Sequence, residues 1–172
     1  MATAIPTTVQ STNAGFQPAF GFVGIGGDRH ADSLAVVATV AGVSLKDVFK
    51  QAEALGMPKV GPYNHWVDSD LLSSLLAGYG WATTEWKEVT AMTHLPALSI
   101  CLVDYDSDCE VGRYVLVHSG VKCSHDSKSI TYIVDPAAVD PQSQIRTDLK
   151  ALKPAWYIGV QPLKAPAAPA KK

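Results

Sequence analysis

Three stretches in the first half of the chain carry apolar residues at the i, i+3, i+4, i+7 spacing of one buried helix face. They span residues 31–41, 45–56 and 70–80, and each ends at or near a glycine. Ser44 precedes the second stretch and the polar pair at 68–69 precedes the third, and these residue types favour N-caps. We therefore expect three consecutive helices in this half of the chain.

The second half has short apolar runs that read as strands. The runs cover residues 81–89, 98–104, 113–118, 130–134 and 156–161. The segments between them are polar and rich in turn-forming residues, as antiparallel hairpins require. Helices followed by strands indicate an α+β domain, in which N-terminal helices pack on a C-terminal antiparallel sheet.

The 172 residues suit one domain flanked by two extensions. Residues 1–19 are rich in Pro, Thr, Ser and Asn, so we expect a flexible N-terminal segment. Residues 20–163 form the expected folded domain, and residues 164–172 are an Ala/Pro/Lys tail that we also expect to be flexible. The start of the chain lacks the basic and apolar regions of a signal peptide, and no apolar run approaches the roughly 18 residues of a spanning helix. We expect a cytoplasmic protein with no membrane span.

Charge and cysteine content narrow the chemistry. The formal net charge of −2 gives no broad basic surface, so we expect no nucleic-acid partner. Cys101, Cys109 and Cys123 are a small, odd set, which favours reduced thiols, and Cys101 lies in an apolar run typical of a core strand. The spacing of Cys109, His118, Cys123 and His125 matches no compact zinc site. We expect neither a metal nor another cofactor.

The glycine-rich stretch 21–42 poses a choice between a phosphate-binding loop and a turn that leads into a helix. Its segment GIGGDR begins like a dinucleotide-binding loop, but Arg29 stands where the third glycine belongs. No Lys-Ser or Lys-Thr pair follows, so the segment is not a Walker loop. Three helices in a row also differ from the alternating strands and helices of a nucleotide-binding fold. We therefore favour the turn.

From Asp28 onward the chain resembles the papain-like cysteine peptidases of the bacteriocin-processing, double-glycine-leader type. DRHADSLAVVATVAG followed by VSLKDV aligns with their catalytic helix, which opens D-C-G-P-x-x-L-A-M, and with the helix after it. VDSDLLSSLLAGYGW is similar to their next helix, GRYVLV to their G-H-Y-V-V-V strand, and ITYIVDPA to the strand that ends in Asp-Pro. The resemblance covers about residues 24–138 and implies a papain-like fold.

The same alignment implies that the catalytic machinery is mostly replaced. Arg29 takes the place of the nucleophilic cysteine, Arg113 that of the histidine, and Gly24 that of the oxyanion-hole glutamine, while Asp135 keeps the family's residue. A guanidinium stays protonated and attacks no carbonyl. The resemblance thus implies a catalytically degenerate site. With His30, which lies next to Arg29, it gives four candidate ligand-binding residues: Arg29, His30, Arg113 and Asp135.

Two interpretations of this site stay open. The arginines and Asp135 can form a structural ion pair, or they can present a positive pocket to a carboxylate or phosphate. Strand alternation places His118 on the face opposite Arg113, so we do not expect His118 to replace the lost base.

Three functions follow as hypotheses. In the family that the chain resembles, degenerate domains attached to secretion transporters bind substrate without cutting it. We therefore expect a non-enzymatic module that binds a peptide or protein partner. The first alternative is an active cysteine hydrolase with a relocated nucleophile, Cys109 or Cys123. The second is a structural or interaction protein of an assembly.

Overall fold

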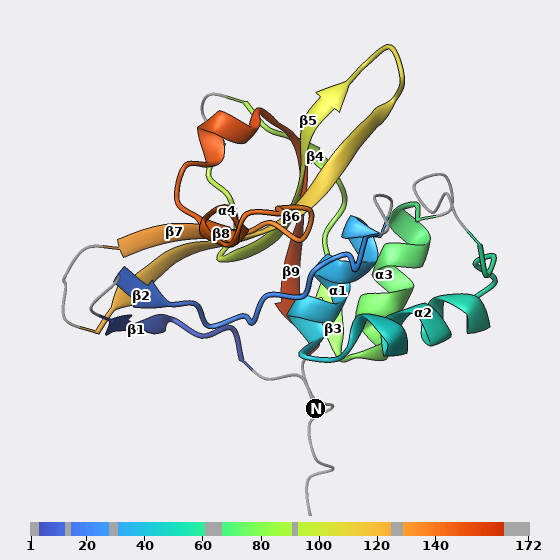
Figure 1. Cartoon of the computed structure of the whole chain (residues 1–172), viewed down its shortest axis with the longest axis horizontal. Coiled ribbons are helices and arrows are strands. Elements are labelled where there is room, and N and C mark those ends of the chain that lie inside the picture. The colour runs from blue at the N-terminus through green and yellow to red at the C-terminus, as the bar shows by residue number, and fades with distance from the viewer. Residues whose placement is uncertain are drawn as a thin grey trace, which may run out of the picture.

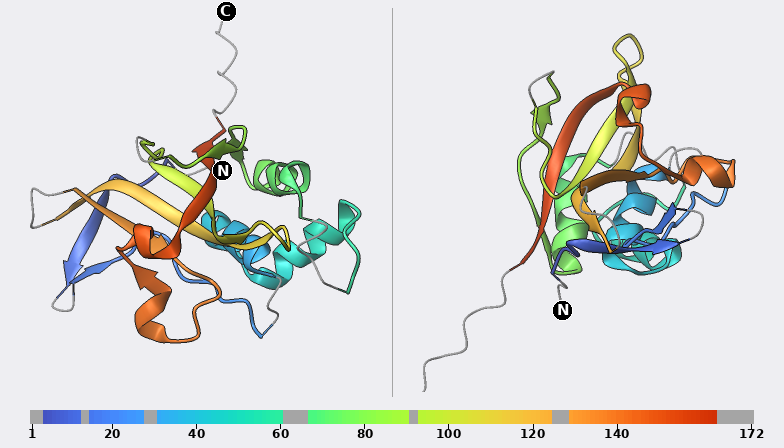
Figure 2. Two further views of the ribbon diagram at one scale, coloured as in Figure 1. Left: turned by 90° about the horizontal axis from the view of Figure 1, so that it is seen from above. Right: turned by 90° about the vertical axis from the view of Figure 1, so that its left-hand side faces the viewer.

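The computed structural model describes residues 4–12, 15–27, 31–60, 67–90, 93–124 and 129–163. Within these residues the chain is a mixed α+β structure with four α-helices and a nine-stranded sheet (Figure 1). The three longer helices lie together beside the sheet, which Figure 2 shows from two further directions. No helix in this part of the chain has the length and apolar character needed to cross a bilayer.

The three predicted helices are present. They are α1 (Asp32–Ala41), α2 (Leu45–Ala54) and α3 (Ser69–Gly78). Gly42 ends α1 in the left-handed conformation with φ 67°. The Ser44 hydroxyl caps α2 by accepting from the backbone N–H of Asp47, and the Asp68 carboxylate caps α3. Local sequence signals thus set the starts of α2 and α3.

Four of the five predicted strands are present and longer than expected, whereas the predicted strand 81–89 is divided into two short strands. They are β3 (Trp81–Thr83), β4 (Lys87–Glu88), β5 (Leu98–Asp106), β6 (Val111–Cys123), β7 (Ser129–Val134) and β9 (Pro154–Pro162). β5 lies antiparallel between β6 and β9, and β7 pairs antiparallel with the edge of β6 that faces away from β5. Three short elements follow β7 that the sequence pattern did not predict: α4 (Pro141–Gln144), β8 (Ile145–Arg146) and the 3-10 helix η2 (Leu149–Leu152).

The N-terminal region differs from the expectation of a flexible segment over residues 1–19. Residues Thr8–Thr12 form β1 and Gly15–Gln17 form β2, and the two strands pair antiparallel. β1 also runs parallel to the end of β6, where Val9 pairs with Cys123. The sheet is therefore mixed and not purely antiparallel as predicted. The mostly polar sequence TVQST has no run of apolar residues, and it is ordered as a strand by its hairpin with β2 and by its pairing with the distant β6. The tail 164–172 lies outside the described residues.

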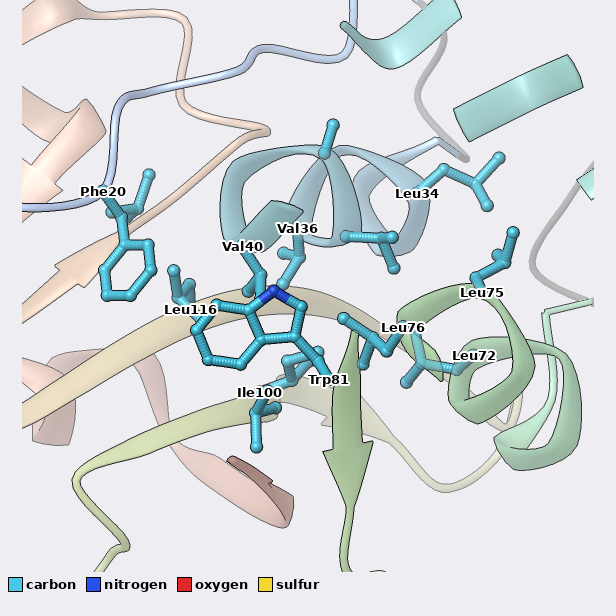
Figure 3. Close-up of a cluster of buried hydrophobic side chains, with 14 of the residues drawn as sticks. Phe20, Leu34, Val36, Val40, Leu72, Leu75, Leu76, Trp81, Ile100 and Leu116 are labelled. Carbon is cyan, nitrogen blue, oxygen red and sulfur yellow. The ribbon is translucent and has the colours of Figure 1, made fainter. Parts of the chain in front are cut away.

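Alternating residues of the central strands face two separate cores. Ile100 and Leu116 point to the helix side, where they meet Trp81 and side chains of α1 and α3 (Figure 3). The intervening residues Cys101 and Val115 join a second cluster on the other face. The prediction that Cys101 lies in the core is confirmed, and burial raises the pKa of its thiol to about 12.

Candidate functional site

The start of α1 is fixed against the start of β6 by a buried carboxylate. The Asp32 side chain, 6% exposed, accepts a hydrogen bond of 2.5 Å from the backbone N–H of Tyr114. Burial raises the pKa of the Asp32 carboxyl, and the hydrogen bond from Tyr114 opposes part of that rise. The helix N-terminus is therefore held next to Arg113, the residue that precedes Tyr114.

Arg113 bridges two carboxylates. Its Nη1 donates to Oδ2 of Asp135, and its Nε donates to Oδ2 of Asp104 at 2.8 Å. Asp135 is buried just after β7, and its Oδ1 accepts from the backbone N–H of Ala137. The contact between Arg113 and Asp135 that the sequence analysis considered is present. Arg29 and His30, the other two candidate residues, lie outside the described part of the chain.

The surroundings of Arg113 keep its side chain charged. Desolvation alone lowers the pKa of the guanidinium, but the hydrogen bonds and charges of Asp135 and Asp104 outweigh it and raise the pKa. The group therefore holds its protons firmly at ordinary pH. It cannot take and return a proton at ordinary pH as an imidazole can.

A cleft of roughly 650 Å³ opens beside Arg113. One wall is the glycine-rich turn 24–27, and the other is the loop 136–139 that follows β7. The backbone N–H of Ile25 donates to the carbonyl of Pro136 at 3.3 Å and ties the two walls together. Gly26 and Gly27 adopt φ values of 63° and 94°, a backbone region that favours glycine.

Most other side chains of the cleft are apolar, and the polar ones are few. Phe22, Ile25, Pro136 and Val139 contribute to the walls, and Gln144 adds an amide. Val139 is 95% exposed, so its side chain is accessible from solvent at the cleft wall. The sequence analysis expected a pocket at Arg113 and Asp135 but did not predict these two walls, which are more than a hundred residues apart in the chain. Their signals were the paired glycines and the Asp-Pro-Ala-Ala sequence, each of which is weak alone.

The described charges around Arg113 are more negative than positive. Asp32, Asp104 and Asp135 all interact electrostatically with Arg113. Arg146 interacts electrostatically with Asp104 and Asp135, and it forms an ion pair of 2.7 Å with the exposed Asp148. Two guanidinium groups thus face four carboxylates. Within the residues that the structure describes, this region is not the positive pocket considered above.

The cysteines named as alternative nucleophiles lie apart from the histidines that the structure describes. Cys109 is exposed in the turn between β5 and β6, and the Cys123 Sγ lies 2.9 Å from the Ser11 hydroxyl. Among the described residues, no cysteine makes a hydrogen bond with a histidine, and no group of three metal-binding side chains is found. Within the described residues, neither thiol is therefore paired with an imidazole.

His118 belongs to a second polar cluster on the helix side of β6. Its Nδ1 lies 3.0 Å from the Tyr132 hydroxyl, and the imidazole also hydrogen-bonds the backbone carbonyl of Pro6. The Tyr132 oxygen in turn accepts from the backbone N–H groups of Ala19 and Phe20. Burial lowers the pKa of His118, and the bond to Pro6 opposes this in part. This histidine joins the N-terminal strand region to the sheet.

A scan against protein-family models finds no match to this chain, and a search of the curated proteins finds no relative. The function is therefore argued from the geometry.

Proposed function

We propose that this chain is a catalytically degenerate domain of the papain-like type that binds a peptide segment of a partner in the cleft beside Arg113. The observation that carries the proposal is the ion pair between Arg113 and Asp135 at one end of that cleft. In the peptidases that the sequence resembles, a histidine and an aspartate occupy these two positions. The close approach of the α1 N-terminus to residue 114 supports the same arrangement.

The chemistry at this position favours binding over catalysis. A cysteine peptidase needs a thiolate at the helix start and a neutral imidazole that moves a proton. In the proposed alignment Arg113 takes the position of the base, and its guanidinium donates hydrogen bonds to two carboxylates. Asp135 orients a guanidinium in place of an imidazole, so the pair supports the cleft and transfers no proton.

The cleft has the properties of a peptide site. Its volume of roughly 650 Å³ falls within the range of about 300–1,000 Å³ typical of ligand sites. Apolar walls can take a side chain, and the turn 24–27 brings backbone groups to the opening. Glycines there leave the backbone accessible to the backbone of a ligand.

A matched pair of variants tests the binding site. Peptides are first selected from a random library by the purified protein, and their dissociation constants are then measured by fluorescence polarisation. Val139→Asn removes an apolar contact from the cleft wall without a change of charge and should weaken binding about tenfold. Val60→Asn makes the same change at a residue that is 80% exposed and outside the cleft. Equal binding by the two variants would reject this cleft as the site.

The hydrolase alternative rests on the exposure of Cys109. Incubation of the selected peptides with the protein, followed by mass spectrometry, should give no cleavage products. Cleavage that iodoacetamide abolishes, and that is lost in Cys109→Ser or Cys123→Ser, would favour a relocated nucleophile over the binding module.

A further inference from the structure

We infer that the cleft selects peptides that carry positive charge and rejects anionic ligands. This inference rests on the proposed function and adds the chemical class of the ligand. It follows from two observations: carboxylates of the protein already balance the charge of Arg113, and further acidic residues surround it.

The charge of Arg113 is already matched within the protein. Asp135 and Asp104 each accept a hydrogen bond from its guanidinium, and the buried Asp32 adds a third carboxylate nearby. Among the residues that the structure describes, a ligand carboxylate or phosphate that approaches Arg113 therefore meets an excess of negative charge. Because anion binding needs a net positive site, this arrangement opposes it.

Arg113 nevertheless keeps hydrogen-bonding capacity. Its Nη2 has no hydrogen-bond partner within the part of the chain that the structure describes, and the side chain lines the cleft while 28% exposed. A guanidinium whose charge is matched still donates well to an uncharged acceptor. The backbone carbonyl of a peptide is such an acceptor.

The acidic character continues along the hairpin that joins β5 to β6. Asp104 is followed by Asp106, Asp108 and Glu110, all exposed. This hairpin extends beyond the helices at the top of Figure 1. Asp104 lies at its base, in contact with Arg113, and is 41% exposed. A lysine or arginine next to a peptide carbonyl bound by Arg113 therefore meets the carboxylate of Asp104.

The inference is tested with charge-matched peptides. Each library-selected peptide is synthesised in its original form, with its Lys and Arg residues changed to Gln, and with them changed to Glu. Dissociation constants are measured at about 0.01 M and 0.15 M salt, since screening shortens the range of charge interactions from about 30 Å to 8 Å. The selected peptides should be basic. The Gln forms should bind about three- to tenfold weaker at low salt and the Glu forms weaker still, with smaller differences at high salt.

Two aspartate variants locate the effect. Asp104→Asn keeps an acceptor for Arg113 Nε but removes one charge, and it should reduce the preference for the basic peptide about two- to fivefold. Asp70→Asn removes an equal charge from α3, which is outside this cleft, and should leave the preference unchanged. Equal loss of preference in both variants would assign it to net charge and overturn the inference.

Other outcomes separate the inference from the proposed function. If peptides bind in a Val139-dependent manner but are neutral or acidic, the inference fails and the proposed function stands. If no peptide binding depends on Val139, both fail. The chain also has its own basic segment, with Lys164, Lys171 and Lys172. Tighter peptide binding after these lysines are changed to Gln would identify that segment as the occupant and overturn the assignment to a partner.

Discussion

Two polar clusters connect β6 to the region of β7, and they differ in charge and in what they face. His118 and Tyr132 form an uncharged cluster that is fully enclosed between the sheet and the N-terminal region. Arg113 and Asp135 form a charged pair at the edge of a cleft. In the first cluster the tyrosine hydroxyl has one donor bond and two acceptor bonds, so its capacity is used completely.

The difference separates a structural role from a binding role on the same two strands. A buried polar cluster whose partners are all internal stabilises one arrangement of the chain. Arg113 lines the cleft, and its Nη2 has no hydrogen-bond partner among the described residues, so it can donate a hydrogen bond to a ligand. The two clusters therefore predict opposite responses to mutation, in stability for one and in binding for the other.

The largest effect on stability is expected for Tyr132→Phe. Loss of the hydroxyl leaves the His118 Nδ1 and the N–H groups of Ala19 and Phe20 without their partner in a buried region. The free energy of unfolding should fall by about 2–4 kcal/mol, as measured by urea denaturation. Peptide binding by the folded fraction should not change. A loss below about 0.5 kcal/mol would show that the cluster is not structural.

A smaller loss of stability is expected for Arg113→Met. Asp135 then stays buried without its cation, and a fall of about 1–2 kcal/mol is expected because Arg113 is itself partly exposed. The double variant Arg113→Met/Asp135→Leu should recover part of this loss, since it removes the unpaired charge as well. Both variants should bind the selected peptides at least tenfold more weakly, and unchanged binding would contradict the role given to Arg113.

Acid should weaken the neutral cluster. The folded-state pKa of His118 lies below its usual 6.5, so the unfolded chain binds the proton first. Stability from this group is therefore present above about pH 6.5 and falls as pH drops through the lowered folded-state value, at no more than about 1.4 kcal/mol per pH unit. Asp32, whose pKa is raised, changes stability in the opposite direction. The test is to measure the urea midpoint as a function of pH for wild type and for His118→Gln. The difference between the two midpoints should shrink as the pH falls below about 6.5, and identical pH profiles would contradict the prediction.

The smallest effect on stability is expected for Asp104→Asn. The Arg113–Asp104 bond lies at the surface, with Asp104 41% exposed, so the loss should stay below about 1 kcal/mol. Urea denaturation checks this value. A loss as large as that of Arg113→Met would show that Asp104, and not Asp135, is the main partner of the guanidinium.

The sequence predicted those parts of the fold that depend on local patterns. Apolar periodicity located α1 to α3, and Ser44 marked a helix start through its capping chemistry. Strand alternation correctly placed Cys101 in a core. β1 and β2 were missed because their sequences are mostly polar, and β1 is held in the sheet by pairing with β6, a strand more than a hundred residues away.

The candidate site was predictable only in part, for the same reason. The alignment with a peptidase motif pointed to Arg113 and Asp135, and the two side chains are in contact. It did not indicate Asp104, which reaches Arg113 across a hairpin, or Asp32, which reaches the backbone of β6 from α1. These contacts depend on how the elements pack against one another, which the spacing of residues along the chain does not predict.

The most direct test of the binding proposal is photo-crosslinking of a selected peptide to the wild-type protein, with the attachment sites mapped by mass spectrometry. The account predicts that crosslinks fall on the two cleft walls, residues 24–27 and 136–139, and that the peptide is recovered uncut. Crosslinks confined to α2 and α3, or recovery of the peptide as cleaved fragments, would contradict it.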